Sequence, residues 1–161
     1  MRNYKNDYIN MLQVTQANLQ QAHETAWAIH WLMRGSRFLT DHPLIDGILE
    51  ELFEETDWIA ERIIQVGGMP LTSLNQVIQN TTINDVPSVY NDDTNNSVKQ
   101  LVDIFETLDD TYNNLHSGAS DAGDVVTTSQ VEQYLGYVEK TIWMLNSELD
   151  KPAVGGSNGQ K

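Results

Sequence analysis

Two pairs of potential metal ligands occur in the segment 41–66, and each pair has a spacing of four residues. His42 and Asp46 form the first pair, and Asp57 and Glu61 form the second. Side chains four residues apart meet on one face of a helix, so either pair could supply half of a metal site built from imidazole nitrogen and carboxylate oxygen. Each pair taken alone also fits the solvated face of an acidic helix.

Helix length decides how the two pairs can act together. His42 and Asp57 are 15 residues apart, about 22 Å along a helix that rises 1.5 Å per residue. Metal bonds to nitrogen and oxygen are only about 2.0–2.2 Å long, so one straight helix cannot bring both pairs to one metal. A second copy packed antiparallel across a two-fold axis can do so, which gives two sites per dimer roughly 20 Å apart.

His30 is a further potential ligand, near the end of the preceding helical segment. A tight reversal over 34–40 would bring the imidazoles of His30 and His42 to the same end of a helix pair. A histidine packed in the core is the alternative. The chain has no cysteine, which excludes thiolate ligands and leaves a His, Asp and Glu set that suits iron or manganese and also permits zinc.

The elements that must position these residues are helices. Apolar residues at spacings of three and four predict four long helices, over 6–33, 41–66, 95–115 and 129–149. The first three are expected to end at Gly35, at Gly67-Gly68 and at Ser117-Gly118. The second helix should turn one apolar stripe to the core: Ile45, Ile48, Leu49, Leu52, Ile59 and Ile63.

The order of these elements predicts the fold. Two helices, a crossover over 67–93 with a short helix within 71–79, and two more helices describe an all-α, ferritin-like four-helix bundle. We expect the bundle over 13–150, a mobile N-terminal segment over 1–12 and a flexible C-terminal tail over 151–161. The segment 119–124 is expected to be an acidic loop.

The composition sets limits on partners. Acids outnumber bases by 23 to 9, which gives a formal charge of −14. Such a surface repels nucleic acid and anionic membrane and attracts cations, although solubility alone also explains it. The N-terminus lacks the apolar stretch of a signal peptide, and no run is long enough to span a membrane. A cytoplasmic location is the expectation.

Three stretches of this sequence resemble the Dps (mini-ferritin) family, and together the resemblance covers about residues 15–150. The first is His30-Trp31-Leu32-Met33-Arg34-Gly35 with Phe38-Leu39, His42-Pro43 and Asp46. The second is Asp57-Trp58-Ile59-Ala60-Glu61-Arg62, which leads to Gly67-Gly68-Met69-Pro70. The third, Glu139-Lys140-Thr141-Ile142-Trp143-Met144-Leu145, is similar to the final helix of the peroxide-resistance branch.

The resemblance implies a ferroxidase. Its ligands would be His30, His42 and Asp46 from one subunit with Asp57 and Glu61 from the partner, and one or two irons would bind at each inter-subunit site. Family members form homododecamers that oxidise Fe(II), preferably with hydrogen peroxide, and store ferric mineral against oxidative stress. An ordinary ferritin, with its site inside each bundle, needs Glu-x-x-His on the helices, and the chain contains no such motif.

Further residues acquire roles from the resemblance. Trp31 and Trp143 match tryptophans that manage reactive oxygen intermediates near the iron, with core packing as the alternative. Asp121 resembles the acid that lines the family's three-fold pore, and Asp124 is a second candidate, with a plain loop acid as the alternative. Asp41 departs from the family pattern beside His42 and could alter its basicity or add a ligand.

DNA binding is the alternative function. Some Dps proteins bind DNA through basic tails, but the tail here carries only two lysines. Arg2 and Lys5 are the other candidate contacts, and twelve copies could add avidity despite a formal charge of about 12 × −14 = −168. A nucleoid-protecting protein with secondary iron chemistry would use this N-terminal segment.

Overall fold

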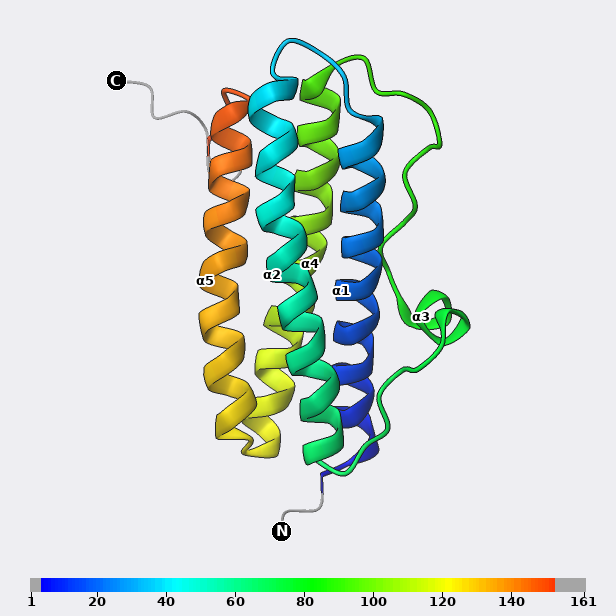
Figure 1. Ribbon diagram of the computed structural model, residues 1–161. Helices are drawn as coiled ribbons and strands as arrows, with labels where there is room; N and C mark the ends of the chain where they lie inside the picture. Colours follow the sequence, from blue (N-terminus) through cyan, green and yellow to red (C-terminus); the bar gives the residue numbers. More distant parts are fainter. Residues whose placement is uncertain (1–3, 153–161) are drawn as a thin grey trace, which may run out of the picture.

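Five α-helices make up the part of the chain that the computed structural model describes, residues 4–152 (Figure 1). They are α1 (Asn6–Leu32), α2 (Phe38–Gln65), α3 (Leu74–Asn80), α4 (Thr94–Ala122) and α5 (Val125–Glu148). The predicted all-α bundle with a short helix in its long crossover is confirmed. No helix of the described part is long and apolar enough to cross a membrane.

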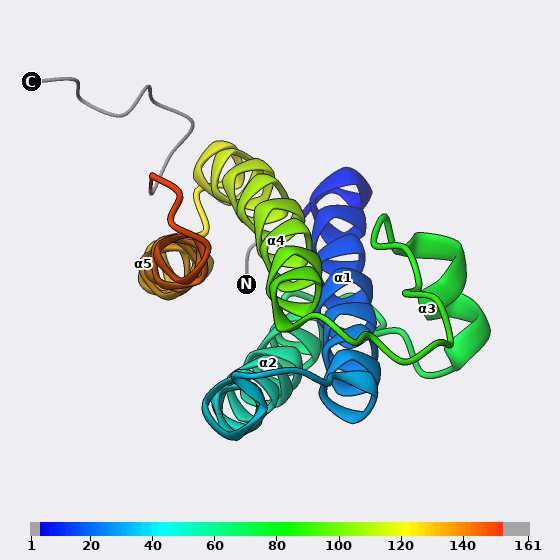
Figure 2. The same ribbon diagram turned by 90° about the horizontal axis from the view of Figure 1, so that it is seen from above.

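The four long helices form the bundle, and α3 lies outside it against α1 (Figure 2). A tight reversal joins α1 to α2, so these two helices run antiparallel. The crossover then returns along the whole bundle, so α4 runs in the same direction as α2 (Figure 1). This connection places the start of α2, the end of α1 and the start of α4 at one end of the molecule.

The core is built from the apolar stripes of the four long helices. The stripe predicted on α2 faces inward, with Ile45, Ile48, Leu52, Ile59 and Ile63 buried, and Leu49 partly buried against the same cluster. These residues pack against large side chains of the other helices, among them Leu12, Leu19, Phe105, Leu108 and Leu145. Burial of this apolar surface is the main force that holds α2 in its orientation.

Buried amides of α1 fix the path of the crossover. The Gln16 side chain donates to the carbonyl of Leu71 at 2.9 Å and accepts from the amide of the same residue at 2.8 Å. Asn18 accepts from the Thr82 amide at 2.8 Å. The crossover ends with backbone bonds between Asn91 and the end of α1. The long connection is therefore attached to the bundle at several points, although its own sequence is polar.

The third long helix extends further than its sequence predicts. Ser117-Gly118 does not end α4, and residues 119–122, expected in an acidic loop, form its last turn. A Cβ atom on Gly118 would overlap the sulfur of Met11. The glycine therefore lies within a helix, beneath the Met11 side chain of α1, instead of terminating one.

At the N-terminus, α1 begins at Asn6, where the predicted helix over 6–33 begins, and Tyr8 and Leu12 are buried in the core. The mobility expected for the segment 1–12 stays a prediction. Arg2 and most of the predicted tail lie outside the described residues.

Candidate metal centre

The two histidines meet at the end of the α1–α2 pair. The rings of His30 and His42 are stacked, with centroids 3.7 Å apart and an angle of 21° between the planes. The His30 Nε2 lies 3.7 Å from Oδ1 of Asp46, one turn further along α2. One subunit thus places His30 beside both His42 and Asp46, the residues that the family resemblance assigns with it to one half of the site.

Backbone carbonyls fix the orientation of both rings. The His30 Nδ1 lies 3.2 Å from the carbonyl oxygen of His42, and the His42 Nδ1 lies 3.1 Å from the carbonyl oxygen of His30. A carbonyl oxygen only accepts, so each Nδ1 carries the hydrogen. Each neutral ring then has its unprotonated nitrogen at Nε2, the atom free to bind a metal.

The second ligand pair lies elsewhere. Asp57 and Glu61 are exposed on α2, about 22 Å and about 28 Å from His42 by the helical rise. Within residues 4–152 of a single subunit, no three His, Asp or Glu side chains converge into a group that could hold a metal ion. The isolated subunit therefore presents two incomplete halves.

Asp41 does not take part in the histidine cluster. Its buried carboxylate accepts from Arg37 Nε at 3.2 Å and from the Thr40 hydroxyl at 3.1 Å. Arg37 Nε also lies 2.7 Å from Glu148, at the end of α5. Asp41, the acid that departs from the family pattern, therefore contacts Arg37, and Arg37 connects the start of α2 to the end of α5.

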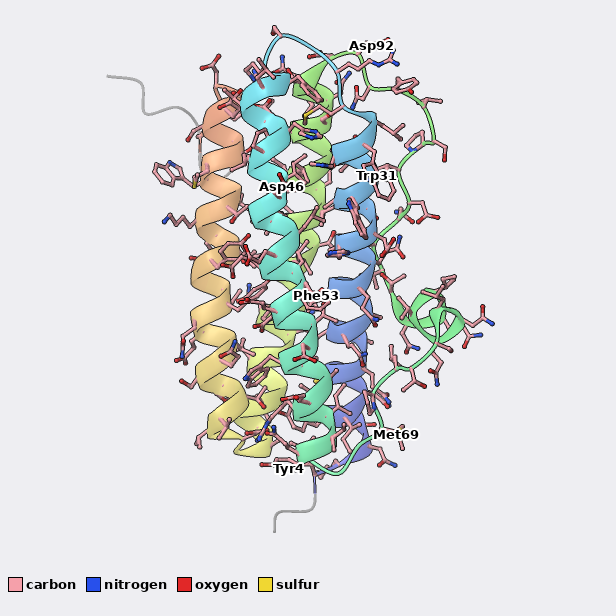
Figure 3. All side chains as sticks on the ribbon, viewed as in Figure 1. Tyr4, Trp31, Asp46, Phe53, Met69 and Asp92 are labelled. Carbon is pink, nitrogen blue, oxygen red and sulfur yellow. The ribbon has the colours of Figure 1, made fainter. Side chains whose placement is uncertain are left out.

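Both predicted tryptophans are at the surface of the subunit. Trp31 is 61% exposed and Trp143 is 52% exposed, so core packing within one subunit does not explain either. Figure 3 shows Trp31 on α1, near the level of Asp46 on α2. A third tryptophan, Trp27, has its ring centroid 5.1 Å from that of Trp31, and its i,i+4 spacing was the signal that could have found it.

The two candidate pore acids lie in different settings. Asp121 is exposed in the last turn of α4. Asp124 is buried and caps α5, and it accepts hydrogen bonds from Tyr8 at 2.8 Å and from Arg62 at 2.6 Å. Burial raises the pKa of this carboxylate, but the donated hydrogen bonds outweigh it and hold the pKa below its usual value. Asp124 thus lies in the short connection between α4 and α5 and stabilises the subunit from inside.

Lys5, the described candidate for DNA contact, is exposed immediately before α1.

Sequence reasoning missed one buried carboxylate. Glu55 of α2 accepts from the Tyr112 hydroxyl at 2.8 Å and from the Gln130 amide at 2.7 Å. Burial raises the pKa of Glu55 to about 7, although these hydrogen bonds lower it. Its helical position beside the core stripe gave no reason to separate it from the neighbouring surface acids.

Comparisons with known proteins match this architecture. The ferritin-like domain family matches residues 9–153. The "DNA protection during starvation protein" of Streptococcus suis is 32% identical over 133 residues, which cover 83% of this chain and 77% of that protein. The chain belongs to the Dps family. Dps from Listeria monocytogenes superposes with a TM-score of 0.87 at 29% identity, over 91% of this chain and 95% of that one.

Another Dps structure, from Listeria innocua, was solved after soaking with zinc. It superposes with a TM-score of 0.86 at 29% identity, over 91% of this chain and 99% of that one. The expected family is therefore confirmed by both sequence and fold.

Proposed function

We propose that this Dps-family chain is a ferroxidase and iron-storage subunit that oxidises Fe(II), preferably with hydrogen peroxide, at sites shared by two subunits. The observation that carries the proposal is the histidine pair, in which both rings are held by backbone carbonyls with Nε2 left for metal. Three ligands on one subunit leave an iron site incomplete, and the acids further along α2 complete it from a partner.

The exposed face of α2 supports this pairing. Leu39, Phe53 and Ile64 are 85%, 68% and 61% exposed. At about 100° per residue, all three fall within about 60° of His42, on the same stripe as the four α2 ligands. Figure 3 shows Asp46 and Phe53 along this side of the helix. Large apolar side chains that alternate with ligands suit a face covered by another protein surface.

A single register of two antiparallel α2 helices brings both ligand pairs and one apolar pair opposite each other. In such a packing, residues that face each other have numbers with a constant sum. His42 with Glu61 gives 103, Asp46 with Asp57 gives 103, and Leu39 with Ile64 gives 103. The two-fold axis then passes near residues 51 and 52, so the exposed Phe53 packs close to its own copy. Ligand pairs and apolar pairs thus favour the same dimer.

The ligand set suits the chemistry. Neutral imidazole and carboxylate bind Fe(II), and the hard carboxylate oxygens favour Fe(III), which makes oxidation easier. Two Fe(II) ions and one peroxide, with two protons, yield two Fe(III) ions and two water molecules. This stoichiometry avoids the one-electron reduction of peroxide that releases hydroxyl radical. We propose that Trp31, close to the same end of the bundle, intercepts radicals that escape this reaction.

The assembly follows from the family. We propose that the two-fold dimers build a homododecameric cage that stores ferric mineral, and that copies of Asp121 at three-fold axes attract Fe(II). Asp124 is buried, so it is left out of this pore.

Subunit mixing tests the shared site. His30→Ala removes a ligand from one half and Asp57→Asn from the other, so cages of either variant should lose fast Fe(II) oxidation. A dimer that contains one of each variant has one doubly defective site and one intact site. Random mixing makes half of the dimers mixed, so co-assembled cages should recover about a quarter of wild-type activity. No recovery in cages of confirmed mixed composition would show that the site lies within one subunit.

DNA protection is the second candidate, favoured by the name of the Streptococcus suis relative and by the exposed Lys5. Because residues 6–12 belong to α1, the test changes charge and deletes nothing. Arg2→Glu with Lys5→Glu should abolish a DNA gel shift at fixed salt if this segment binds the phosphate backbone. A shift that the charge reversal leaves unchanged rejects this contact.

A further inference from the structure

Two indole rings lie in contact on the surface of α1. The ring centroids of Trp27 and Trp31 are 5.1 Å apart, and the ring planes meet at an angle of 33°. The spacing of four residues places one ring directly above the other on the helix, at a separation typical of interacting aromatic pairs. An electron can therefore pass between the two tryptophans across a single ring contact.

The indole pair lies beside a proposed iron ligand. Trp31 directly follows His30 in the chain, and Trp27 precedes it by three residues, a spacing that makes Trp27 and His30 neighbours on the surface of α1. Trp31 lies near the level of Asp46 of α2 (Figure 3). The pair thus begins at the half of the shared site that this subunit contributes.

Packing within the subunit does not account for the pair, since Trp31 is 61% exposed and Trp27 is 38% exposed. Indole is among the most easily oxidised side chains. When it loses an electron, the radical cation readily releases the proton on its Nε1 atom, and the exposure of Trp27 lets water accept that proton. The setting of the two rings therefore suits electron transfer better than it suits a structural role.

Peroxide that meets a shared site with only one Fe(II) leaves one oxidising equivalent over. The Fe(II) gives one electron, the O–O bond breaks, and the products are Fe(III), hydroxide and a hydroxyl radical. The hydroxyl radical takes an electron from Trp31 and becomes a second hydroxide. The Trp31 radical cation in turn takes an electron from Trp27, which loses its Nε1 proton to water and becomes a neutral radical.

We propose that Trp27 is the second member of a tryptophan pair that stores this oxidising equivalent until another Fe(II) reaches the site. The inference rests on the proposed ferroxidase function. The second Fe(II) gives its electron to the Trp27 radical, which regains a proton, and Fe(III) forms. In sum, two Fe(II), one peroxide and two protons yield two Fe(III) and two water molecules, the same stoichiometry as at a site that holds both irons from the start.

The substitution Trp27→Tyr gives the pair a radical that can be told apart. It retains an oxidisable ring, but tyrosyl and tryptophanyl radicals differ in their electron paramagnetic resonance spectra. Cages with one Fe(II) per shared site are mixed with hydrogen peroxide and frozen. We expect Trp27→Tyr to raise the tyrosyl signal at least fivefold above wild type, and Trp31→Phe to remove this increase.

Trp27→Phe is the matched control, because it retains an aromatic ring of similar size that is not readily oxidised. We expect it to raise the amount of hydroxyl radical caught by a spin trap at least twofold, and Trp27→Tyr to keep that amount near the wild-type level. If Trp27→Phe and Trp27→Tyr release the same amount of radical, the ring at position 27 serves packing only and the proposal is wrong.

Pulse radiolysis of the iron-free cage tests the relay without the ferroxidase reaction. Azide radicals oxidise exposed tryptophans, Trp31 among them, and optical absorption follows the conversion of tryptophanyl into tyrosyl radical. We expect Trp27→Tyr to accelerate this conversion at least fivefold, and Trp31→Phe to abolish the acceleration. An unchanged rate would reject the relay and leave the ferroxidase proposal untouched. An accelerated rate without any peroxide-dependent Fe(II) oxidation would confirm the relay and reject the ferroxidase proposal.

Discussion

At the scale of single residues, the histidine pair shows how a ligand can be oriented without any other side chain. Each ring donates from Nδ1 to the backbone of the other, so the metal-binding nitrogen is fixed by the helix reversal itself. Carbonyl partners of this kind set the tautomer as well as the ring plane. The sequence supplied the two histidines and their spacing, but no pattern in it contained this reciprocal contact.

The substitution His42→Asn tests the roles of the two ring nitrogens of His42 separately. The asparagine amide nitrogen occupies the place of Nδ1 and can still donate to the His30 carbonyl, whereas nothing replaces Nε2. We therefore expect His42→Asn to lower peroxide-dependent Fe(II) oxidation at least tenfold while unfolding free energy changes by less than about 1 kcal/mol. Stopped-flow oxidation and thermal melts measure the two effects, and His42→Ala is the comparison that loses both groups. Wild-type oxidation rates in His42→Asn would exclude Nε2 as a ligand.

Asp124 carries a prediction about acid stability. Its partner Arg62 is largely buried, and removing one member of a buried ion pair costs about 3–5 kcal/mol, so Asp124→Asn should melt well below the wild type near pH 7. The folded pKa of Asp124 is depressed, so its stabilisation is fully present above the unfolded value of about 3.9 and is lost as the pH falls through the folded value.

The difference between the two melting temperatures should therefore close as melts are repeated at progressively lower pH below about 3.9. A constant difference down to about pH 2 would mean that the charge of Asp124 is not what stabilises the α2–α5 contact.

At the scale of helices, periodicity predicted which segments are helical, and close contacts decided where they end. The stripe on α2 is regular and its burial follows the expectation. The end of α4 was mispredicted because Gly118 lies inside the helix, against the Met11 side chain, and only the position of α1 reveals this contact. The crossover path was equally hidden, since it depends on Gln16 and Asn18, two polar residues within an otherwise ordinary helix.

Two glycines give opposite predictions at this scale. A Cβ on Gly68, just after α2, would overlap the side chains of Ile9 and Ile63, and Ile63 is fully buried. Gly68→Ala should therefore destabilise the protein by about 1–3 kcal/mol. Gly136 in α5 has open space around it, so Gly136→Ala should stabilise by about 0.5–1 kcal/mol through helix propensity. Chemical denaturation measures the free energy of unfolding of both variants. If both substitutions changed it in the same direction, the packing argument would be contradicted.

At the scale of the whole molecule, one face of α2 carries both the proposed interface and the proposed chemistry. The sequence predicted the division of ligands between subunits from helix length alone. The exposed apolar residues that reinforce the same register became evident only when the burial of each side chain was known.

Phe53 is the residue that tests this face. Near a two-fold axis it packs against its own copy, so Phe53→Glu would place two negative charges together in an already acidic molecule. We expect loss of the large assembly in sedimentation velocity, accompanied by loss of fast Fe(II) oxidation, whereas Phe53→Leu should retain both. An intact, active cage in Phe53→Glu would exclude this register.

The antiparallel register of α2, in which the numbers of facing residues have a constant sum, also constrains how such a protein can evolve. One residue inserted between Asp46 and Asp57 would turn the second ligand pair by about 100° and move it by about 1.5 Å. Symmetry would impose the same error on both copies, so no change at a single position could compensate for it. Loops, tails and the crossover can gain or lose residues between species, while the number of residues in this stretch of α2 should stay invariant.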